Sequence, residues 1–317
     1  MKWAIWSYRL PLRYPLAVLG EHTKTREGLI IGQKINDEWR YGEAAPLPSF
    51  HNISLQNVFQ QIRRYFTSNQ PVSSSVAQYA IDMLFMTPSK KQTILLNALS
   101  SGHPKEAMTI HPGFTSIKVK VGRRSLNEDR DHLLYLRDHM RSSVSFRLDA
   151  NRLWDRDQAQ RFIDNNQDLN IEYIEEPTQQ SEDIQWLQGA HIALDESLDS
   201  NSESLHYPQV KYLIIKPTLQ GGVSGLQFWR QKAKENQQNI ILSSTFESSL
   251  GLWGLGHLAA EVQPNQAHGL GTLRWFEKDT TSFPICGSGP KMNLEKNQPE
   301  INLIGLNLEE SNDMSII

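Results

Sequence analysis

Between residues 116 and 246 the chain alternates short apolar segments with amphipathic ones at a nearly constant spacing. The segments that read as buried strands are SIKVKVG at 116–122, VSFRLDAN at 144–151, IEYIEEP at 171–177, HIALDES at 191–197, VKYLIIKP at 210–217 and NIILSSTF at 239–246. The stretches between them repeat apolar residues at helical spacing, for example Ala159, Phe162 and Ile163. Regular strand–helix repetition without a dinucleotide-binding glycine motif predicts a closed α/β barrel of parallel strands.

The first 92 residues follow a different pattern. Strand-like segments occur at 2–12, 28–36 and 39–46, and helix-like segments follow at 54–66 and 74–84. This order predicts an α+β domain over residues 1–92, followed by the barrel over residues 93–289. Residues 17–28, AVLGEHTKTREG, are mainly polar and are expected to form a mobile loop of the first domain.

The composition excludes several classes of protein. The chain has 317 residues, 38% hydrophobic and 21% charged, with a formal net charge of −3, as is ordinary for a soluble globular protein. Lysine and arginine do not cluster with aromatic residues, so we expect neither nucleic acid nor a membrane surface as partner. Cys286 is the single cysteine, which excludes an internal disulfide and a thiolate metal cluster.

Two features of the sequence indicate where in the cell the protein is expected. No stretch approaches the roughly 20 apolar residues of a membrane span. The N-terminal residues lack the sustained apolar region of a signal peptide. We therefore expect a cytoplasmic protein, and a monomer is compatible with the sequence.

Polar residues stand at the end of every predicted barrel strand. In chain order they are Lys118 and Lys120, Asp149 and Asn151, Glu175, Asp195, Lys216, and Ser243 to Thr245. The C-terminal ends of parallel barrel strands meet on one face, where the catalytic groups of barrel enzymes lie. Asp149, Glu175 and Asp195 are each about one strand–helix unit apart, so three carboxylates from neighbouring strands are expected to converge.

Three converging carboxylates provide the hard oxygen ligands that Mg²⁺ prefers, and Mn²⁺ takes such sites as well. For one acid alone, an ion pair with a lysine inside the barrel is the simpler explanation. Three acids on successive strands, with a lysine before and a lysine after, favour a metal site. We therefore predict that Asp149, Glu175 and Asp195 bind the metal.

Lys118 and Lys120 lie two residues apart and therefore share one face of their strand. A lysine acts as a base only when it is neutral, and burial and nearby positive charge lower its pKa toward working pH. We expect the charge of Lys118 to lower the pKa of Lys120 in this way. Arg147 and Asn151 share the face of Asp149, where they would either orient the acids or form an interior hydrogen-bond network.

The motifs at these positions resemble the enolase superfamily, in the branch that contains muconate cycloisomerase and o-succinylbenzoate synthase. They are KVK at 118–120, RLDAN at 147–151, EEP at 175–177, LDES at 194–197 and IKPTL at 215–219. Further segments resemble the o-succinylbenzoate synthase family in particular: KTREGL at 24–29, GEAAPLPSF at 42–50, SSTFESSLGL at 243–252 and HGLGTL at 268–273. The resemblance covers nearly the whole chain.

The resemblance implies a modified (β/α)8 barrel of the (β/α)7β kind behind an N-terminal α+β capping domain, with the tail at about 290–317 returning to the cap. It implies a carbon–oxygen lyase of menaquinone biosynthesis that dehydrates 2-succinyl-6-hydroxy-2,4-cyclohexadiene-1-carboxylate, a small carboxylate substrate, to 2-succinylbenzoate. Lys120 would be the general base and Lys216 the opposing cation, beside Mg²⁺ at the three acids. Ser243, Ser244 and Gly269 would line the substrate pocket, although a serine pair at a strand end is also a common turn former.

Two other functions are compatible with the same motifs. N-succinylamino acid racemases and dipeptide epimerases share this scaffold, and there the two lysines act from opposite faces of the substrate. A non-catalytic binding protein would be expected to have lost acids or lysines of the site, and none is missing. One position departs from the family pattern, because Gly271 stands where an aspartate is expected.

Overall fold

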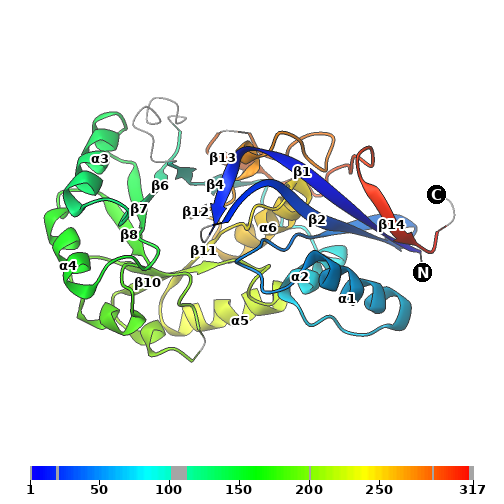
Figure 1. Ribbon diagram of the computed structural model, residues 1–317, viewed down its shortest axis with the longest axis horizontal. Coiled ribbons are helices and arrows are strands. Elements are labelled where there is room, and N and C mark those ends of the chain that lie inside the picture. The colour runs from blue at the N-terminus through cyan, green and yellow to red at the C-terminus, as the bar shows by residue number, and fades with distance from the viewer. Residues whose placement is uncertain (1, 19–20, 101–112, 200, 288, 314–317) are drawn as a thin grey trace.

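The computed structural model describes residues 2–18, 21–100, 113–199, 201–287 and 289–313. It contains an N-terminal antiparallel sheet with two helices packed on it, and a barrel of parallel strands with helices on the outside (Figure 1). Within these ranges no helix combines the length and the apolar character that a membrane span requires. The predicted fold class, a βα barrel with an α+β cap, is confirmed.

The cap sheet has the strand order β14-β1-β2-β3. Its strands are β1 (Trp3–Val18), β2 (Glu21–Ile35), β3 (Glu38–Ala44) and β14 (Asn307–Ser311). A loop was predicted over residues 17–28, of which residues 19 and 20 lie outside the described part of the chain. For the other residues the prediction was wrong, since β1 extends to Val18 and β2, which begins at Glu21, pairs with it in antiparallel fashion. Threonine is common in half-exposed strands, so the threonines of this segment are as compatible with a strand as with a loop.

Both faces of β1 are apolar, and each is buried against a different partner. Trp3 and Ile5 pack on the helices α1 (Leu55–Ser68) and α2 (Ser75–Phe85), whereas Trp6 and Tyr8, on the opposite face, join the core that continues into the barrel. Alternation of side chains along a strand explains this division. The sheet is therefore a layer between the cap helices and the rest of the molecule.

Seven parallel strands form the curved sheet of the barrel, in the order β11-β10-β9-β8-β7-β6-β5. They are β5 (Ala98–Leu99), β6 (Ser116–Lys120), β7 (Ser145–Asp149), β8 (Ile171–Glu175), β9 (Ile192–Leu194), β10 (Val210–Ile215) and β11 (Asn239–Leu242). Closure comes from β12 (Ala267–His268), which pairs in parallel with β4 (Thr93–Leu96), the strand that leads into β5, and is followed by a parallel bridge between Gly269 and Ser243. The sheet thus closes on itself.

Helices cover the barrel strands from outside. They are α3 (Leu126–Asp138), α4 (Arg156–Asn165), α5 (Gly222–Glu235) and α6 (Ser249–Val262). The connections after β8 and β9 contain the short 3-10 helices η2 (Ser181–Trp186) and η3 (Glu203–His206), and η4 (Leu273–Trp275) follows β12. Helix α4 buries Ala159, Phe162 and Ile163, the apolar face that the sequence predicts.

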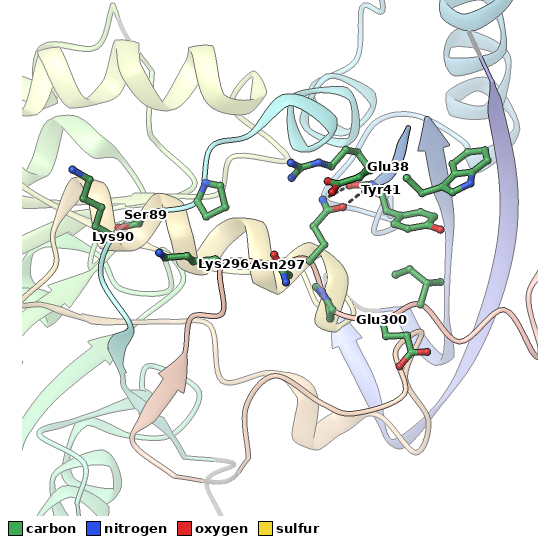
Figure 2. A pocket seen from close by; sticks show the side chains of 13 residues that line it. Glu38, Tyr41, Ser89, Lys90, Lys296, Asn297 and Glu300 are labelled. Carbon is green, nitrogen blue, oxygen red and sulfur yellow. Dashed lines mark hydrogen bonds between the residues drawn. The ribbon is translucent and has the colours of Figure 1, made fainter. Parts of the chain in front are cut away.

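The C-terminal segment contacts both parts of the chain. Strand β13 (Lys291–Asn293) pairs with β4, and β14 pairs with β1. Between them, the Gln298 side chain accepts a hydrogen bond from Tyr41 N and donates one to Tyr41 O, both at 2.7 Å, so that it continues the pairing of edge strand β3. A surface hollow of about 700 Å³ lies between β3, residues 88–90 and residues 296–301 (Figure 2). None of its lining residues belongs to the predicted site.

Buried polar side chains join the cap to the barrel. The Glu43 carboxylate accepts hydrogen bonds from Ser248 N and Gly251 N at the start of α6. A second contact involves Asp82 of α2. Its carboxylate accepts a hydrogen bond of 2.7 Å from Val223 N in the first turn of α5, where the N-cap residue Gly221 has no side chain to do so.

Candidate active site

A pocket of about 160 Å³ opens where the barrel strands end under the cap. Among its lining residues are most of those that the sequence predicted: Lys118, Lys120, Asp149, Asn151, Asp195, Lys216, Ser243, Ser244 and Gly269. Around the barrel in one direction, β7, β8 and β9 lie between β6 and β10. In the other direction lie β5 together with β4, then β12, then β11, so β6 and β10 are on opposite sides of the barrel. Lys120 and Lys216 therefore reach the pocket from opposite sides.

The Lys118 ammonium group lies between two buried carboxylates. Its Nζ atom is 2.7 Å from Asp149 Oδ2 and 2.7 Å from Glu175 Oε1. Both acids are almost completely buried, whereas the Lys118 side chain is 19% exposed. Glu175 does not line the pocket itself but lies behind Lys118, at the end of β8.

For Lys118 and Asp149, burial and nearby charge shift the pKa in opposite directions. Burial would lower the pKa of Lys118, but the charges of Asp149, Glu175 and Asp195 raise it well above its ordinary value. Burial would raise the pKa of Asp149, but Lys118 and Lys120 hold it below its usual range. The pKa of Glu175 is raised well above its ordinary value by burial and by the nearby charge of Asp149, with Lys118 opposing the shift. Lys118 is therefore a fixed positive charge.

Lys120 lies nearer the pocket opening and is 35% exposed. Its ammonium group donates hydrogen bonds to Asp149 Oδ2 at 2.5 Å and to Asn151 Oδ1 at 2.7 Å. Asn151 is held in turn, because its Nδ2 donates to Glu196 Oε1 and its backbone N–H donates to Asp149 Oδ1. Asn151 thus orients both an acid and a lysine of the site.

Lys216 stands on the other side and is buried. Its ammonium group donates a hydrogen bond to Asp195 Oδ1. The Phe50 ring, from the cap, lies with its centroid 5.7 Å from Lys216 Nζ. The ring face of an aromatic residue attracts a cation at such a distance.

Ion pairs rather than a metal cluster hold these acids in the structure. Across the part of the chain that is described, no group of three or more His, Cys, Asp or Glu residues is arranged to hold a metal ion. The chemistry of the donors nevertheless fits Mg²⁺, since Asp149, Glu175 and Asp195 are neighbouring carboxylates that supply only oxygen. Burial and the charge of Asp149 raise the pKa of Glu175 while Lys118 opposes the shift, so further positive charge at this position would favour the ionised carboxylate. The metal ligand set remains a prediction.

Arg147 does not orient the acids. Its guanidinium group pairs with Glu172, with Nη2 2.8 Å from Oε1, and donates a hydrogen bond to Ala267 O. It lies outside the pocket, near the Tyr173 ring. Of the two interpretations of Arg147, the interior hydrogen-bond network is therefore the one that the structure shows.

The side of the pocket formed by β11, β12 and β4 is uncharged. Ser243, Ser244, Gly269 and Thr272 line it, and Ser244 Oγ is 2.9 Å from Thr272 Oγ1. Gly271 lies there too, and an added Cβ atom would find its nearest neighbour, Leu96 Cδ1, at 3.8 Å. A side chain could therefore start at this position without a clash at Cβ.

Sequence reasoning did not assign a role to the cap residues that complete the pocket. Leu47 and Phe50 line it from the cap, and Asn97 and Leu99 line it from the strand that opens the barrel. Their residue types alone carry no sign of a site. The sequence signal for Leu47 and Phe50 is the segment GEAAPLPSF, which contains both residues and resembles the o-succinylbenzoate synthase family.

Comparison with known proteins agrees with this arrangement. Residues 104–287 match the family described as enolase C-terminal domain-like, and residues 1–82 match the family described as MenC, N-terminal domain. An o-succinylbenzoate synthase of Pasteurella multocida (strain Pm70) is 28% identical over 304 residues, which cover 86% of this chain and 89% of the relative.

Solved structures of similar fold include an epimerase and an o-succinylbenzoate synthase. The L-Ala-D/L-Glu epimerase from Bacillus subtilis, in a substrate-liganded complex, has a TM-score of 0.81 at 20% identity and covers 99% of both chains. The o-succinylbenzoate synthase from Thermosynechococcus elongatus BP-1, complexed with Mg in the active site, has a TM-score of 0.71 at 24% identity, covering 87% of this chain and 94% of that one. The chain therefore belongs to the enolase superfamily, and its first 82 residues match the MenC N-terminal domain.

Proposed function

We propose that this protein is an o-succinylbenzoate synthase, a lyase that dehydrates 2-succinyl-6-hydroxy-2,4-cyclohexadiene-1-carboxylate to 2-succinylbenzoate. The observation that carries the proposal is the placement of Lys120 and Lys216 on opposite sides of one pocket, with three acids on the strands between them. The curated relative of that name and the MenC-type N-terminal domain support this choice of reaction.

The reaction removes a proton from the carbon that bears the carboxylate and a hydroxide from the neighbouring carbon. Neutral Lys120 takes the proton, and the resulting ammonium group gives a proton to the departing hydroxide, which leaves as water. The two electrons of the broken C–H bond form the new ring double bond, and the ring becomes aromatic. Lys216, held by Asp195 on the other side, offers a positive charge to the anion that develops in between.

Asp149, Glu175 and Asp195 would hold Mg²⁺, or Mn²⁺ in its place. The solved o-succinylbenzoate synthase from Thermosynechococcus elongatus, which is complexed with Mg in its active site, supports the use of this metal. When bound, the ion supplies positive charge against the substrate carboxylate. Lys118 supports the site because its charge partly compensates the charges of Asp149 and Glu175. Asn151 keeps the Lys120 ammonium group directed at the pocket.

The direct test is turnover of the cyclohexadiene substrate by the purified protein, followed by the appearance of 2-succinylbenzoate. Lys120→Ala should abolish the reaction, and Lys2→Ala, at a half-exposed residue that does not line the pocket, should not change it. Failure of the intact protein to convert this substrate with Mg²⁺ present would refute the proposal.

Racemisation or epimerisation is the second candidate, because the opposed lysines also suit proton removal and return on opposite faces. The similarity of fold to the Bacillus subtilis epimerase supports it. A panel of N-succinyl amino acids and dipeptides in D₂O separates the two. Deuterium at the α-carbon with inversion, in the absence of diene dehydration, would favour the second candidate.

A further inference from the structure

The cap loop, which we define as residues 45–51, forms the part of the pocket wall next to Lys216. Leu47 and Phe50 of this loop line the pocket. Within the loop, Leu47 O accepts hydrogen bonds from Phe50 N at 3.1 Å and from His51 N at 2.9 Å. Leu47 N donates to His51 Nδ1 at 2.9 Å. The loop is therefore a closed turn whose shape depends on the His51 ring.

Two side chains fix this turn to the barrel. At its start, the buried Arg26 donates to Pro46 O at 2.8 Å, and the same guanidinium group donates to Thr245 O at 3.1 Å. At its end, His51 Nε2 lies 3.1 Å from Thr218 O. Because Nδ1 accepts the Leu47 N–H, the proton of the neutral ring is on Nε2, which donates to Thr218.

The contact made by His51 is close to Lys216 along the chain and in space. Thr218 follows Lys216 by two residues and is buried, with its hydroxyl 3.0 Å from Thr245 Oγ1 and 3.2 Å from Glu247 Oε1. It is thus a rigid point of attachment. Phe50, the residue before His51, has its ring centroid 5.7 Å from Lys216 Nζ.

We propose that His51 is a positioning residue, whose hydrogen bond to Thr218 fastens the cap loop to the β10 strand end and thereby fixes the Phe50 ring beside the Lys216 ammonium group. The proposal rests on the proposed function, since Lys216 is assigned its role there. His51 acts through Phe50 and does not contact the substrate. It lies behind the loop, where it lines a separate hollow of about 630 Å³ together with Pro48 and Asn52.

A role for His51 as an acid or a base does not fit its surroundings. Both ring nitrogens are engaged with backbone groups, and the ring does not line the catalytic pocket. Burial and the charge of Arg26 lower its pKa to about 4, so the ring is neutral at physiological pH. A neutral ring with one donor and one acceptor is what the two backbone partners require.

The test compares three substitutions of His51. Gln places an amide N–H near the position of Nε2, Asn places a polar group only near Nδ1, and Ala removes both. We expect His51→Ala and His51→Asn to lower kcat/KM about fivefold, the equivalent of one neutral hydrogen bond, mainly through KM, and His51→Gln to retain most activity. Asp82→Asn, which weakens another cap–barrel hydrogen bond, is the matched control and should leave KM unchanged.

A double-mutant cycle with Phe50→Leu tests the route of the effect. If His51 acts through Phe50, His51→Ala should have little further effect on KM in the Phe50→Leu background. Additive effects of the two changes would overturn the proposal. So would a His51→Gln variant that is as impaired as His51→Ala.

Hydrogen exchange of the substrate-free protein gives a readout that does not depend on the reaction. Backbone amides of the cap loop should exchange faster in His51→Ala than in the parent or in Asp82→Asn. Unchanged exchange in His51→Ala would refute the anchoring role. If the parent does not dehydrate the diene but the loop exchange responds as expected, the proposed function fails while the anchor stands.

Discussion

Replacement of Lys118 by methionine tests the electrostatic account of the site most directly. Methionine is similar in length and uncharged, so Lys118→Met removes one cation and keeps most of the packing volume. Glu175 then loses both hydrogen bonds from Lys118, at 2.7 and 2.8 Å, and Asp149 loses one of its two lysine partners and keeps Lys120. Removal of one partner of a buried ion pair costs about 3–5 kcal/mol, because a buried charge is left without compensation.

The cost of Lys118→Met should depend on pH in a defined direction. The pKa of Glu175 in the folded protein lies above its unfolded value, because of burial and the charge of Asp149, and loss of Lys118 raises it further. The folded state then holds a proton that the unfolded state has released. Stability therefore falls as pH rises from the unfolded pKa of Glu175, about 4.5, toward its folded pKa, by at most about 1.4 kcal/mol per pH unit.

The measurement is differential scanning calorimetry of the parent and Lys118→Met at pH 5 and pH 8, without divalent metal. We expect the melting temperature at pH 8 to fall by roughly 10 °C, and the deficit to be smaller at pH 5. Arg9→Met is the control, because it removes an ion pair with Glu27 in which both side chains are at least half exposed and which is worth about 0–1 kcal/mol. Equal losses in the two variants, or a deficit in Lys118→Met that does not depend on pH, would show that Lys118 does not compensate the buried acids.

Three further predictions concern the site. Lys120→Ala should reduce kcat by about 10²-fold or more in the dehydration assay, since the proton acceptor is lost; a variant with near-parental kcat would exclude Lys120 as the base. Asp195→Asn should weaken Mg²⁺ binding in isothermal titration calorimetry, and excess chelator should stop turnover by the parent; unchanged metal affinity would remove Asp195 from the ligand set. Arg147→Met should lower the melting temperature, because it leaves Glu172 without its partner, while KM stays close to that of the parent; a large change in KM would mean that Arg147 acts on the pocket after all.

Local patterns in the sequence predicted the fold and most of the site. The strand–helix repeat predicted the barrel, and the polar residue at each strand end predicted which side chains share the pocket. These inferences succeed because a parallel barrel imposes its geometry: the ends of all strands meet on one face, so order along the chain becomes order around the pocket. Lys120 and Lys216 could therefore be placed in one pocket without a structure.

The same patterns could not determine which partner each side chain takes. Alternation along β7 places Arg147 on the same face as Asp149, but the two are separated along the strand by about 7 Å, and Arg147 meets Glu172 below the pocket. Alternation predicts which face of a strand a side chain is on, but not how far from the pocket that side chain lies along the barrel. In the same way, it could not decide between ion pairs and a metal cluster for the three acids.

Contacts between the two parts of the chain were decided by tertiary structure alone. Phe50 completes the pocket, His51 bonds to Thr218, and Asp82 caps α5, yet each lies more than 130 residues from its partner in the barrel. No periodicity connects positions so far apart, because periodicity describes one element at a time. The sequence by itself determined the strand ends that bear the acids and lysines, and the packing of the cap on the barrel decided how that pocket is closed.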